Sequence, residues 1–330
     1  MSAVNLEAAR IGNALDADEW RAESVAEILE GLTAPQKRIS PKYFYDELGS
    51  RLFDEICNLP EYYPTRTEYE IMQAHLPEIA ELVGPEAAVI ELGAGSNAKA
   101  RQLLHHLDRP IAYVPVEISG KYLAGQAAEL QTEFPELSVQ PVVADFTKPF
   151  DLPEHSEDPA RNLVFFPGST IGNFTRPDAR ELLEVMRCEA KPGGSLLIGV
   201  DLIKDIDVVL AAYNDSQGVT AAFNLNALKH LNETVGTDFA IESFEHEAIY
   251  DAEKHRIEMR LVSLKPQSVA IDGETIPFEE GEHIVTEYSH KYSVDMFRSL
   301  ASEAGWSSDS LWVDDDRLFS VHFLTVPGES

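Results

Sequence analysis

The stretch AAVIELGAGSNAK, residues 87–99, decides the fold. A short apolar run leads into two glycines, Gly93 and Gly95, and then into the start of an amphipathic segment. Glycines at such a strand-to-helix turn let the backbone approach a nucleotide-bearing ligand closely. With Ala98 in its third place, the loop fits the pattern G-x-G-x-x-G/A. Sites for NAD, FAD and S-adenosylmethionine share this pattern, and a purely structural turn also fits it.

Apolar and amphipathic segments alternate after the glycine loop. The apolar run at 87–92 is predicted as the first strand, and four further strands are predicted at residues 111–119, 139–146, 162–174 and 195–203. Helical patterns follow the first, second and fourth of these five strands. Strand–helix alternation of this kind is typical of a doubly wound parallel sheet covered on both faces. The sequence therefore predicts an α/β fold of the Rossmann-like type.

The last strands predicted in the chain differ from those of a nicotinamide-binding domain, which usually adds parallel strands at this point. Residues 293–306 predict a helix with Ser293 as its N-cap and Gly305 just past its end. Residues 307–326 then predict two strands joined by an acidic turn. A terminal helix and an antiparallel pair of this kind match class I methyltransferase topology.

Residues 204–290 have a different pattern. Two helical segments precede several strands in which apolar and polar residues alternate, as in an antiparallel sheet with one wet face. The sequence IDGET at 271–275 signals a hairpin between two of these strands. We expect a smaller α+β unit inserted into the first sheet.

The net charge, the cysteine content and the lack of long apolar runs limit the classes of partner and the cell compartment that we expect. The formal net charge of −31 argues against a nucleic acid or an anionic membrane as the main partner. Cys57 and Cys188 make no disulfide framework, which favours a reducing compartment. No secretory signal and no run of about 18 apolar residues occurs, so we expect a cytoplasmic protein.

Three features favour S-adenosylmethionine among the possible cofactors. Glu91 directly precedes the glycines, where it would be poorly placed beside a pyrophosphate. Asp145 ends the third strand, where a carboxylate can accept from an adenine amino group, and Glu117 ends the second, where it can bind a ribose diol. The third feature is the terminal helix with its strand pair. A site rich in acids suits a cationic sulfonium that carries no phosphate.

Four stretches together carry a family resemblance: PKYFYDELGSRLFDEICNLPEYYPTRTE (41–68), ELGAGSNAK (91–99), FFPGSTIGNF (165–174) and TEYSHKY (286–292). From about residue 38 onward, the chain resembles the histidine-specific methyltransferase of ergothioneine biosynthesis. The resemblance implies trimethylation of the α-amine of L-histidine to hercynine with three S-adenosylmethionine molecules. It also implies a methyltransferase core at 68–203 and 291–330, and a discontinuous substrate-binding domain at 1–67 and 204–290.

The resemblance also implies roles for individual residues. Asn173 and Tyr213 are expected on the α-amine and carboxylate of the amino acid, while Gly168 and Thr170 lie beside the transferring methyl group. Glu117 departs from the family, whose members carry aspartate there, but either carboxylate can bridge ribose hydroxyls. The imidazole side is implied for Tyr62, Met259, Glu287 and Ser289. The cofactor positions are Tyr45, Gly93, Gly95, Lys99, Glu117, Asp145 and Phe146.

The residues themselves support part of this assignment. Glu287 and Ser289 are two apart on a predicted strand, so both face the same side, where a carboxylate and a hydroxyl can engage both nitrogens of an imidazole. Asn173 could instead cap the helix that follows it. Tyr213 and Met259 could be ordinary core residues.

The mechanism we expect has no metal and no covalent intermediate. Orientation supplies most of the rate, and the amine proton is lost to water near Tyr45. We expect a monomer. The alternatives are an N-methyltransferase acting on another amino acid or aromatic amine, a non-catalytic regulator that binds S-adenosylmethionine, and a nicotinamide oxidoreductase.

Overall fold

The computed structural model describes residues 17–95, 97–118, 120–155 and 157–328. These residues form two compact units: unit 1 is 66–202 with 292–328, and unit 2 is 17–65 with 203–291. The chain passes from one unit to the other at 65/66, at 202/203 and at 291/292. Residues 1–16 and Ser96 of the glycine loop lie outside the described residues.

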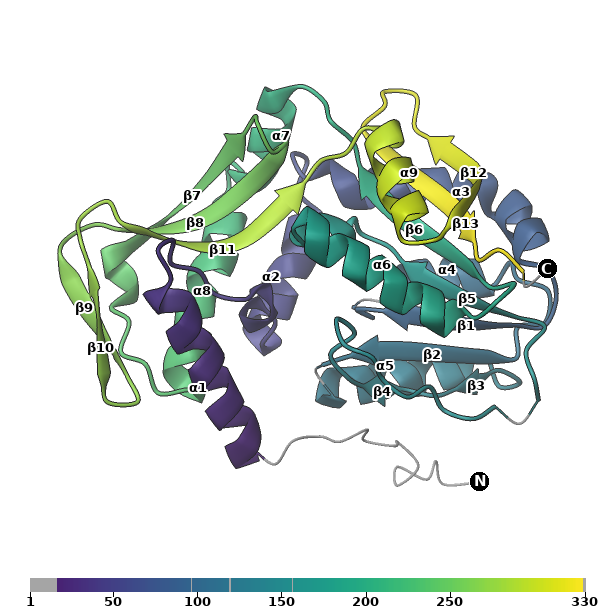
Figure 1. Ribbon diagram of the computed structural model, residues 1–330, viewed down its shortest axis with the longest axis horizontal. Coiled ribbons are helices and arrows are strands. Elements are labelled where there is room, and N and C mark those ends of the chain that lie inside the picture. The colour runs from purple at the N-terminus through teal and green to yellow at the C-terminus, as the bar shows by residue number, and fades with distance from the viewer. Residues whose placement is uncertain (1–16, 96, 119, 156, 329–330) are drawn as a thin grey trace. The chain divides into compact units, whose positions relative to one another are not determined.

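Unit 1 is an α/β unit whose strands and helices alternate along the chain (Figure 1). Helix α3 (Tyr63–Val83) enters it across the boundary at 65/66. The elements that follow are β1 (Ala87–Leu92), α4 (Ala98–Leu104), β2 (Ala112–Glu117), α5 (Gly120–Glu133), β3 (Ser138–Val139), β4 (Val142–Val143), β5 (Arg161–Phe166), the 3-10 helix η3 (Thr170–Asn173), α6 (Arg176–Ala190), β6 (Ser195–Asp201), α9 (Val294–Glu303), β12 (Ser307–Val313) and β13 (Phe319–Thr325).

Within the described part of unit 1, the strands form one sheet in the order β12-β13-β6-β5-β1-β2-β3, with β4 also paired to β2. The β2-β1-β5-β6 pairs are parallel, whereas β13 runs antiparallel to both β6 and β12. This order, with its antiparallel terminal pair, confirms the predicted class I methyltransferase architecture. It also brings the carboxyl ends of β1, β2 and β5 to one edge of the sheet.

Alternate residues of the central strands enter two separate cores. Ile90 and Val164 face a core that includes residues of α6 and α9, whereas Val89 and Leu163 face one that includes residues of α3 and α4. All six residues of β1 are buried, as expected for a central strand covered on both faces. Helices on both faces make the sheet doubly wound, as predicted.

The C-terminal helix has the predicted boundaries. The backbone N–H of Met296 donates to Ser293 Oγ at 3.1 Å, which caps the first turn of α9. Gly305, just past the helix, has a φ of +85°, a left-handed conformation that glycine adopts without strain.

Two predicted strands are wrong in extent. The strand expected at 139–146 is split into β3 and β4, because Pro141 between them has no N–H to donate to a ladder. The strand expected at 162–174 ends at Phe166, and the chain turns at Pro167 and Gly168 into η3. The turn directs residues 167–173 away from the sheet, so that they form a loop beyond its edge.

Unit 2 combines helices with antiparallel strands. Among its described residues, β11-β8-β7 form one sheet and β10-β9 a second, and the turn between β9 and β10 has positive φ at both Asp272 and Gly273, as the hairpin signal predicts. The elements are α1 (Ala17–Thr33), the 3-10 helix η2 (Pro41–Phe44), α2 (Glu47–Cys57), α7 (Ile206–Tyr213), α8 (Val219–Thr234), the 3-10 helix η4 (Ile241–Ser243), β7 (Phe244–Asp251), β8 (Arg256–Ser263), β9 (Gln267–Ile271), β10 (Glu274–Phe278) and β11 (His283–His290).

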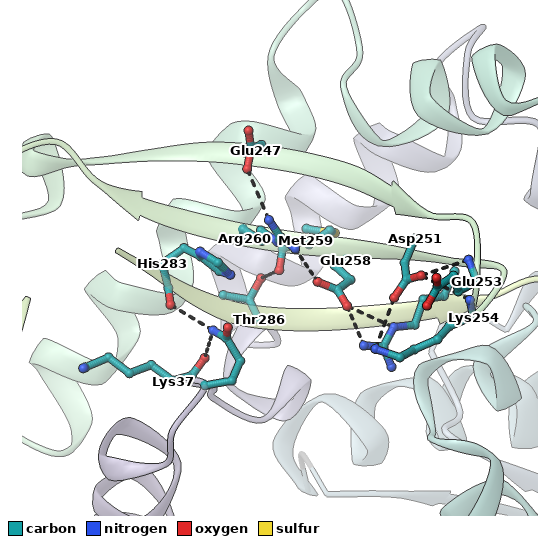
Figure 2. A network of polar contacts seen from close by, with 12 residues as sticks. Lys37, Glu247, Asp251, Glu253, Lys254, Glu258, Met259, Arg260, His283 and Thr286 are labelled. Atoms are coloured by element: carbon teal, nitrogen blue, oxygen red, sulfur yellow. Dashed lines mark hydrogen bonds and ion pairs between the residues drawn. The ribbon is translucent and has the colours of Figure 1, made fainter. Parts of the chain in front are cut away.

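Polar contacts fix the central strand of the three-stranded sheet (Figure 2). Glu258 on β8 accepts from Arg256 at 2.5 Å and from Arg260 at 2.6 Å. On the neighbouring strand, Thr286 Oγ1 lies 2.7 Å from its acceptor Asn224 Oδ1 on α8 and 3.2 Å from the Met259 carbonyl of β8. The β8–β11 register shifts between Val285 and Glu287, directly beside that contact. The side-chain bond therefore helps to hold β11 in place where its pairing is irregular.

Candidate active site

The glycine turn between β1 and α4 has the geometry that its sequence predicts. Gly93 has a φ of +70°, and its N–H donates to the Val116 carbonyl at 2.9 Å. A Cβ at this position would lie 3.4 Å from the Phe146 ring, so the turn is tight as well as left-handed. Gly95 is exposed, and a Cβ added there would meet no atom of the described residues within 4 Å. The turn therefore leaves open backbone at the edge of the sheet.

Acidic side chains follow the neighbouring strands at the same edge. Glu117 ends β2, is half-buried, and accepts the Ile118 N–H at 2.8 Å. Asp145 lies just beyond β4, where its Oδ1 accepts the Thr147 hydroxyl at 2.6 Å and the Thr147 N–H at 3.0 Å. The register of β2 pairs Glu117 with Val143, two residues before Asp145. The structure thus brings these two predicted cofactor residues to adjacent strand ends.

Glu91 is the buried member of this acidic group. Tyr113 donates its hydroxyl to the Glu91 carboxylate, and only 3% of Glu91 is exposed. Burial raises the pKa of Glu91 to about 7, against the lowering effects of the Tyr113 bond and of Lys99. The edge therefore combines three carboxyl groups with Lys99, a balance that is consistent with a positively charged ligand there.

Lys99 is paired with Glu68, a residue that the sequence analysis missed. Glu68 is on α3, is 1% exposed, and forms an ion pair with the Lys99 ammonium. The backbone N–H of Gly168 also donates to the same carboxylate, at 3.0 Å to Oε1 and 2.9 Å to Oε2. One carboxylate therefore links the predicted cofactor lysine to the loop that follows β5.

That loop carries the predicted residues Gly168, Thr170 and Asn173. Gly168 has a φ of +83°, and the Thr170 hydroxyl donates to the Pro167 carbonyl at 3.1 Å. Asn173 is the last residue of η3 and is half-buried. The N-cap of α6 is Thr175, so the alternative role of Asn173 as the cap of that helix is excluded.

Aromatic rings gather in unit 2 around Phe53 and Phe223. The centroid of Tyr45 lies 5.9 Å from that of Phe53 and 5.8 Å from that of Phe223, with edge-to-face geometry in both pairs. Tyr62 continues the series, at 6.4 Å from Phe53 and 6.1 Å from Tyr213. Burial, followed by the proximity of Tyr213, raises the pKa of Tyr62 well above its ordinary value. Tyr62 therefore presents a neutral hydroxyl on an aromatic wall.

The predicted ring-binding residues Met259, Glu287 and Ser289 lie on β8 and β11, and Tyr213, predicted on the substrate carboxylate, contacts Ser289 from the end of α7. Tyr213, the last residue of α7, has its hydroxyl 2.7 Å from Ser289 Oγ. Met259 on β8 is buried and stands opposite Glu287 of β11 in the strand register. Tyr62 is close enough to Glu287 for the carboxylate to contribute to the raised pKa of the phenol.

Lys291 is the second functional candidate that the sequence analysis missed. It is 1% exposed, and its ammonium donates to Ser289 Oγ at 2.7 Å and to the Tyr213 hydroxyl at 3.0 Å. Burial raises the pKa of Glu287 to about 7, and the nearby Lys291 opposes that shift. A signal was present in the sequence, because residues 287, 289 and 291 alternate onto one face of a strand, but lysine is rarely expected inside.

Metal and membrane features are limited to two findings. Among the described residues, no group of three or more His, Cys, Asp or Glu side chains is placed to hold a metal ion. No helix in the described ranges is long and apolar enough to cross a membrane.

The sheet order, the glycine turn and the acidic strand ends define unit 1 as a class I methyltransferase core. A family model described as "Histidine-specific methyltransferase, SAM-dependent" matches residues 24–326. The histidine N-alpha-methyltransferase of Mycolicibacterium smegmatis is 37% identical over 310 residues, covering 92% of this chain and 95% of that relative. The Mycobacterium tuberculosis protein of the same name is 34% identical, covering 92% and 95%.

A further relative has a different name and length. Ergothioneine biosynthesis protein 1 of Neurospora crassa is 31% identical over 287 residues, which are 85% of this chain and 32% of that longer protein. The chain belongs to the family of histidine-specific, S-adenosylmethionine-dependent methyltransferases. It is therefore an enzyme that uses S-adenosylmethionine, and the nicotinamide and non-catalytic alternatives are excluded.

Proposed function

We propose that this enzyme transfers three methyl groups to the α-amine of L-histidine and forms hercynine, in ergothioneine biosynthesis. The observation that carries the proposal is the position of Glu287 and Ser289, which lie two residues apart on β11. Ser289 Oγ is 2.7 Å from both the Tyr213 hydroxyl and the Lys291 ammonium, and Glu287 lies on the same strand near Lys291. A carboxylate and an oriented hydroxyl offer an acceptor and a donor, which are what the two nitrogens of a neutral imidazole need.

The residues of unit 1 fit the cofactor. The left-handed turn at Gly93 exposes the open backbone of Gly95 to close approach, and Glu117 can accept from both ribose hydroxyls. Asp145 and Phe146 suit the adenine, through a hydrogen bond and ring contact, while Gly95 and Lys99 of unit 1 and Tyr45 of unit 2 complete the proposed set. When bound, S-adenosylmethionine supplies the methyl group of its sulfonium. The carboxylates of Glu117 and Asp145 at this edge favour a ligand of that charge.

The residues proposed for the substrate divide between its two ends. Asn173 and Tyr213 are assigned to the α-amine and carboxylate, because an amide and a phenol offer both donors and acceptors. Tyr62 and Met259 are assigned to the two faces of the ring, beside the polar pair Glu287 and Ser289. The aromatic wall with Tyr62 and Tyr45 tolerates an amine that becomes a permanent cation, through cation–π attraction.

The chain's contribution to the rate is mainly orientation. The α-amine must be neutral to attack, so one proton leaves before each transfer, and we propose that it passes to water near the Tyr45 hydroxyl. Tyr45 is 37% exposed, which gives such a proton a route to solvent. Gly168 and Thr170 are proposed beside the attacking amine, in a loop fixed by the hydrogen bonds of Gly168 to Glu68. Holding amine and acceptor carbon in line is the principal source of acceleration in this scheme.

Mass spectrometry in competition tests the proposal. The protein is incubated with S-adenosylmethionine and an equimolar mixture of the common amino acids, including histidine and tryptophan. We expect mass gains of one, two and finally three methyl groups on histidine alone. Methylation of another amino acid in preference to histidine would reject the substrate and retain the enzyme class.

We also propose that the enzyme acts as a cytoplasmic monomer. Among the described residues, Cys57 and Cys188 form no disulfide, which suits a reducing compartment. Light scattering of the purified protein is expected to give the mass of one 36.6 kDa chain, and twice that mass would contradict the monomer.

A further inference from the structure

Lys291 is buried against Ser289 and Tyr213 and does not face solvent. It directly follows β11, its ammonium reaches back to Ser289, and the residue is 1% exposed. The ammonium lies 4.8 Å from the centroid of the Tyr213 ring and donates to both the Tyr213 and the Ser289 hydroxyls. A buried lysine with two oxygens in reach acts on a ligand through those oxygens.

The ammonium decides how the two hydroxyls are oriented. An ammonium carries hydrogens only, so both oxygens must accept from it. The hydroxyl hydrogens of Tyr213 and Ser289 therefore point away from Lys291, and at most one of them is used in the 2.7 Å bond between the two oxygens. The arrangement presents donor character on the side away from the ammonium, which complements a nitrogen lone pair.

Charge supports the same preference. Lys291 and Glu287 together are neutral when both are ionised, so a neutral ring adds no net charge to the site. An imidazolium would place a second cation near Lys291 and would have no lone pair for the hydroxyl. Tyr62 and Tyr213 face this pair from the segment before α3 and from α7, and His290 lies beside it on β11.

One of these neighbouring groups titrates in the range where histidine does. The pKa of Glu287 is about 7, whereas burial lowers the pKa of His290 to about 4 and raises that of Tyr62 well above its ordinary value. Between pH 5.5 and pH 8, Tyr62 and His290 therefore stay neutral, and Glu287 and the free substrate ring change their protonation.

We propose that Lys291 is a specificity-determining positioning residue, which orients the Ser289 and Tyr213 hydroxyls and restricts the ring site to a neutral ring with a nitrogen lone pair. This inference rests on the proposed function. In the wild type, binding then requires that the substrate ring and the Glu287 carboxyl both lose their protons. Without the ammonium, an imidazolium can stay protonated against the Glu287 carboxylate, so binding releases one proton fewer.

The test is the pH dependence of histidine binding, measured by calorimetry on the full chain with S-adenosylhomocysteine present. From pH 8 to pH 5.5 we expect wild-type affinity to fall about a hundredfold, as two groups with pKa values near 7 gain protons. For Lys291→Met we expect a fall about tenfold smaller than that of the wild type, because the Glu287 proton is still released but the ring proton is not. Lys291→Arg, which keeps the charge, is expected to resemble the wild type.

A matched control is available in the same unit. Lys204 donates to the Tyr63 hydroxyl at 2.6 Å and lies 4.2 Å from the Tyr63 ring centroid, so Lys204→Met removes a lysine–tyrosine contact away from Ser289. Its acid loss is expected to equal that of the wild type. Equal acid losses in wild type and Lys291→Met would overturn the role of Lys291.

A ligand control keeps the inference testable if Lys291→Met does not fold. The 1,2,4-triazole analogue of histidine has a ring that stays neutral and keeps lone pairs throughout this range, so the wild type should lose about tenfold less affinity for it on acidification. Equal losses for histidine and the analogue would overturn the inference. A wild type that binds no histidine at pH 8 would contradict the proposed function itself.

Discussion

Glu68 and Lys99 form a buried ion pair in which the same carboxylate also receives the N–H of Gly168. Gly199 on β6 leaves the space for it, because a Cβ there would lie 1.9 Å from Glu68 Oε1. A glutamate on α3, a lysine on α4 and a loop after β5 are therefore tied to one another through two oxygen atoms. The pair connects the cofactor position Lys99 with the loop proposed to orient the amine.

Replacing Glu68 with glutamine should be costly. The amide can still accept from Gly168, but it leaves the Lys99 ammonium without its carboxylate in a largely buried place. We expect the free energy of unfolding to fall by about 3 kcal/mol or more, which urea denaturation will measure. Glu70→Gln on the same helix is the control, because Glu70 is exposed and should change stability little. Similar stabilities of the two variants would show that the pair contributes nothing.

Glu91 should make stability depend on pH. Its pKa is raised to about 7 in the folded protein, above the value of an unfolded glutamate, so folding favours the protonated carboxyl. The stability from this group is present below about pH 4.5 and is lost as the pH rises through 7. Between pH 5.5 and pH 8, the free energy of unfolding should therefore decrease by about 2 kcal/mol more in the wild type than in Glu91→Gln. Urea midpoints at both pH values test this, and parallel losses in variant and wild type would contradict it.

Glu287→Gln should impair histidine methylation selectively. The variant loses the carboxylate that accepts a ring N–H, and the amide competes with a donor of its own. We expect kcat/KM for histidine to fall about a hundredfold, mostly through KM, because the loss is in ring binding. Steady-state kinetics with S-adenosylmethionine in excess will measure this. Glu274→Gln, at an exposed position of β10, serves as the control. A variant as active as the control would place the imidazole elsewhere.

Gly93 and Gly95 should respond differently to alanine. At Gly93 the φ of +70° is unfavourable for alanine, and the added Cβ would touch Phe146 at 3.4 Å. We expect Gly93→Ala to lose about 1–2 kcal/mol of stability and Gly95→Ala to lose less than half of that. Thermal denaturation without cofactor separates this backbone effect from ligand binding. A larger loss at Gly95 would mean that the strain has been assigned to the wrong glycine.

Much of unit 1 could be predicted because its signals are local. The glycine turn, the Ser293 cap and the strand–helix alternation each depend on residues that are neighbours in the chain. Pro141 also carried a local signal, and the split of β3 from β4 could have been predicted from it. The position of β13 beside β6 follows from the terminal pair once the class of fold is known.

Glu68 and Lys291 could not be found in the same way. Glu68 is one of several acids on a helix that looks partly exposed, and its burial appears only when α3 packs on the sheet with Lys99 and Gly199 nearby. Lys291 has the right alternation with Glu287, yet its bond to the Tyr213 hydroxyl joins residues that are far apart in the sequence. The roles of Glu68 and Lys291 depend on contacts with residues far away in the sequence. The glycine turn and the Ser293 cap could be predicted because their sequence signals lie within a few residues.

The crossings at 202/203 and 291/292 are neighbours in space, since Leu202 pairs with Tyr292 and the Tyr292 N–H donates to the Asp201 carbonyl at 3.0 Å. The segment 203–291 therefore leaves unit 1 and returns to it at two adjacent points, which are joined by this hydrogen bond. The inserted segment packs with residues 17–65, because Asn226 Nδ2 donates to Asp46 and the His230 ring contacts the Tyr43 carbonyl. New amine substrates could thus arise in such enzymes by joint changes in two stretches of unit 2, while the sheet of unit 1 is inherited unchanged.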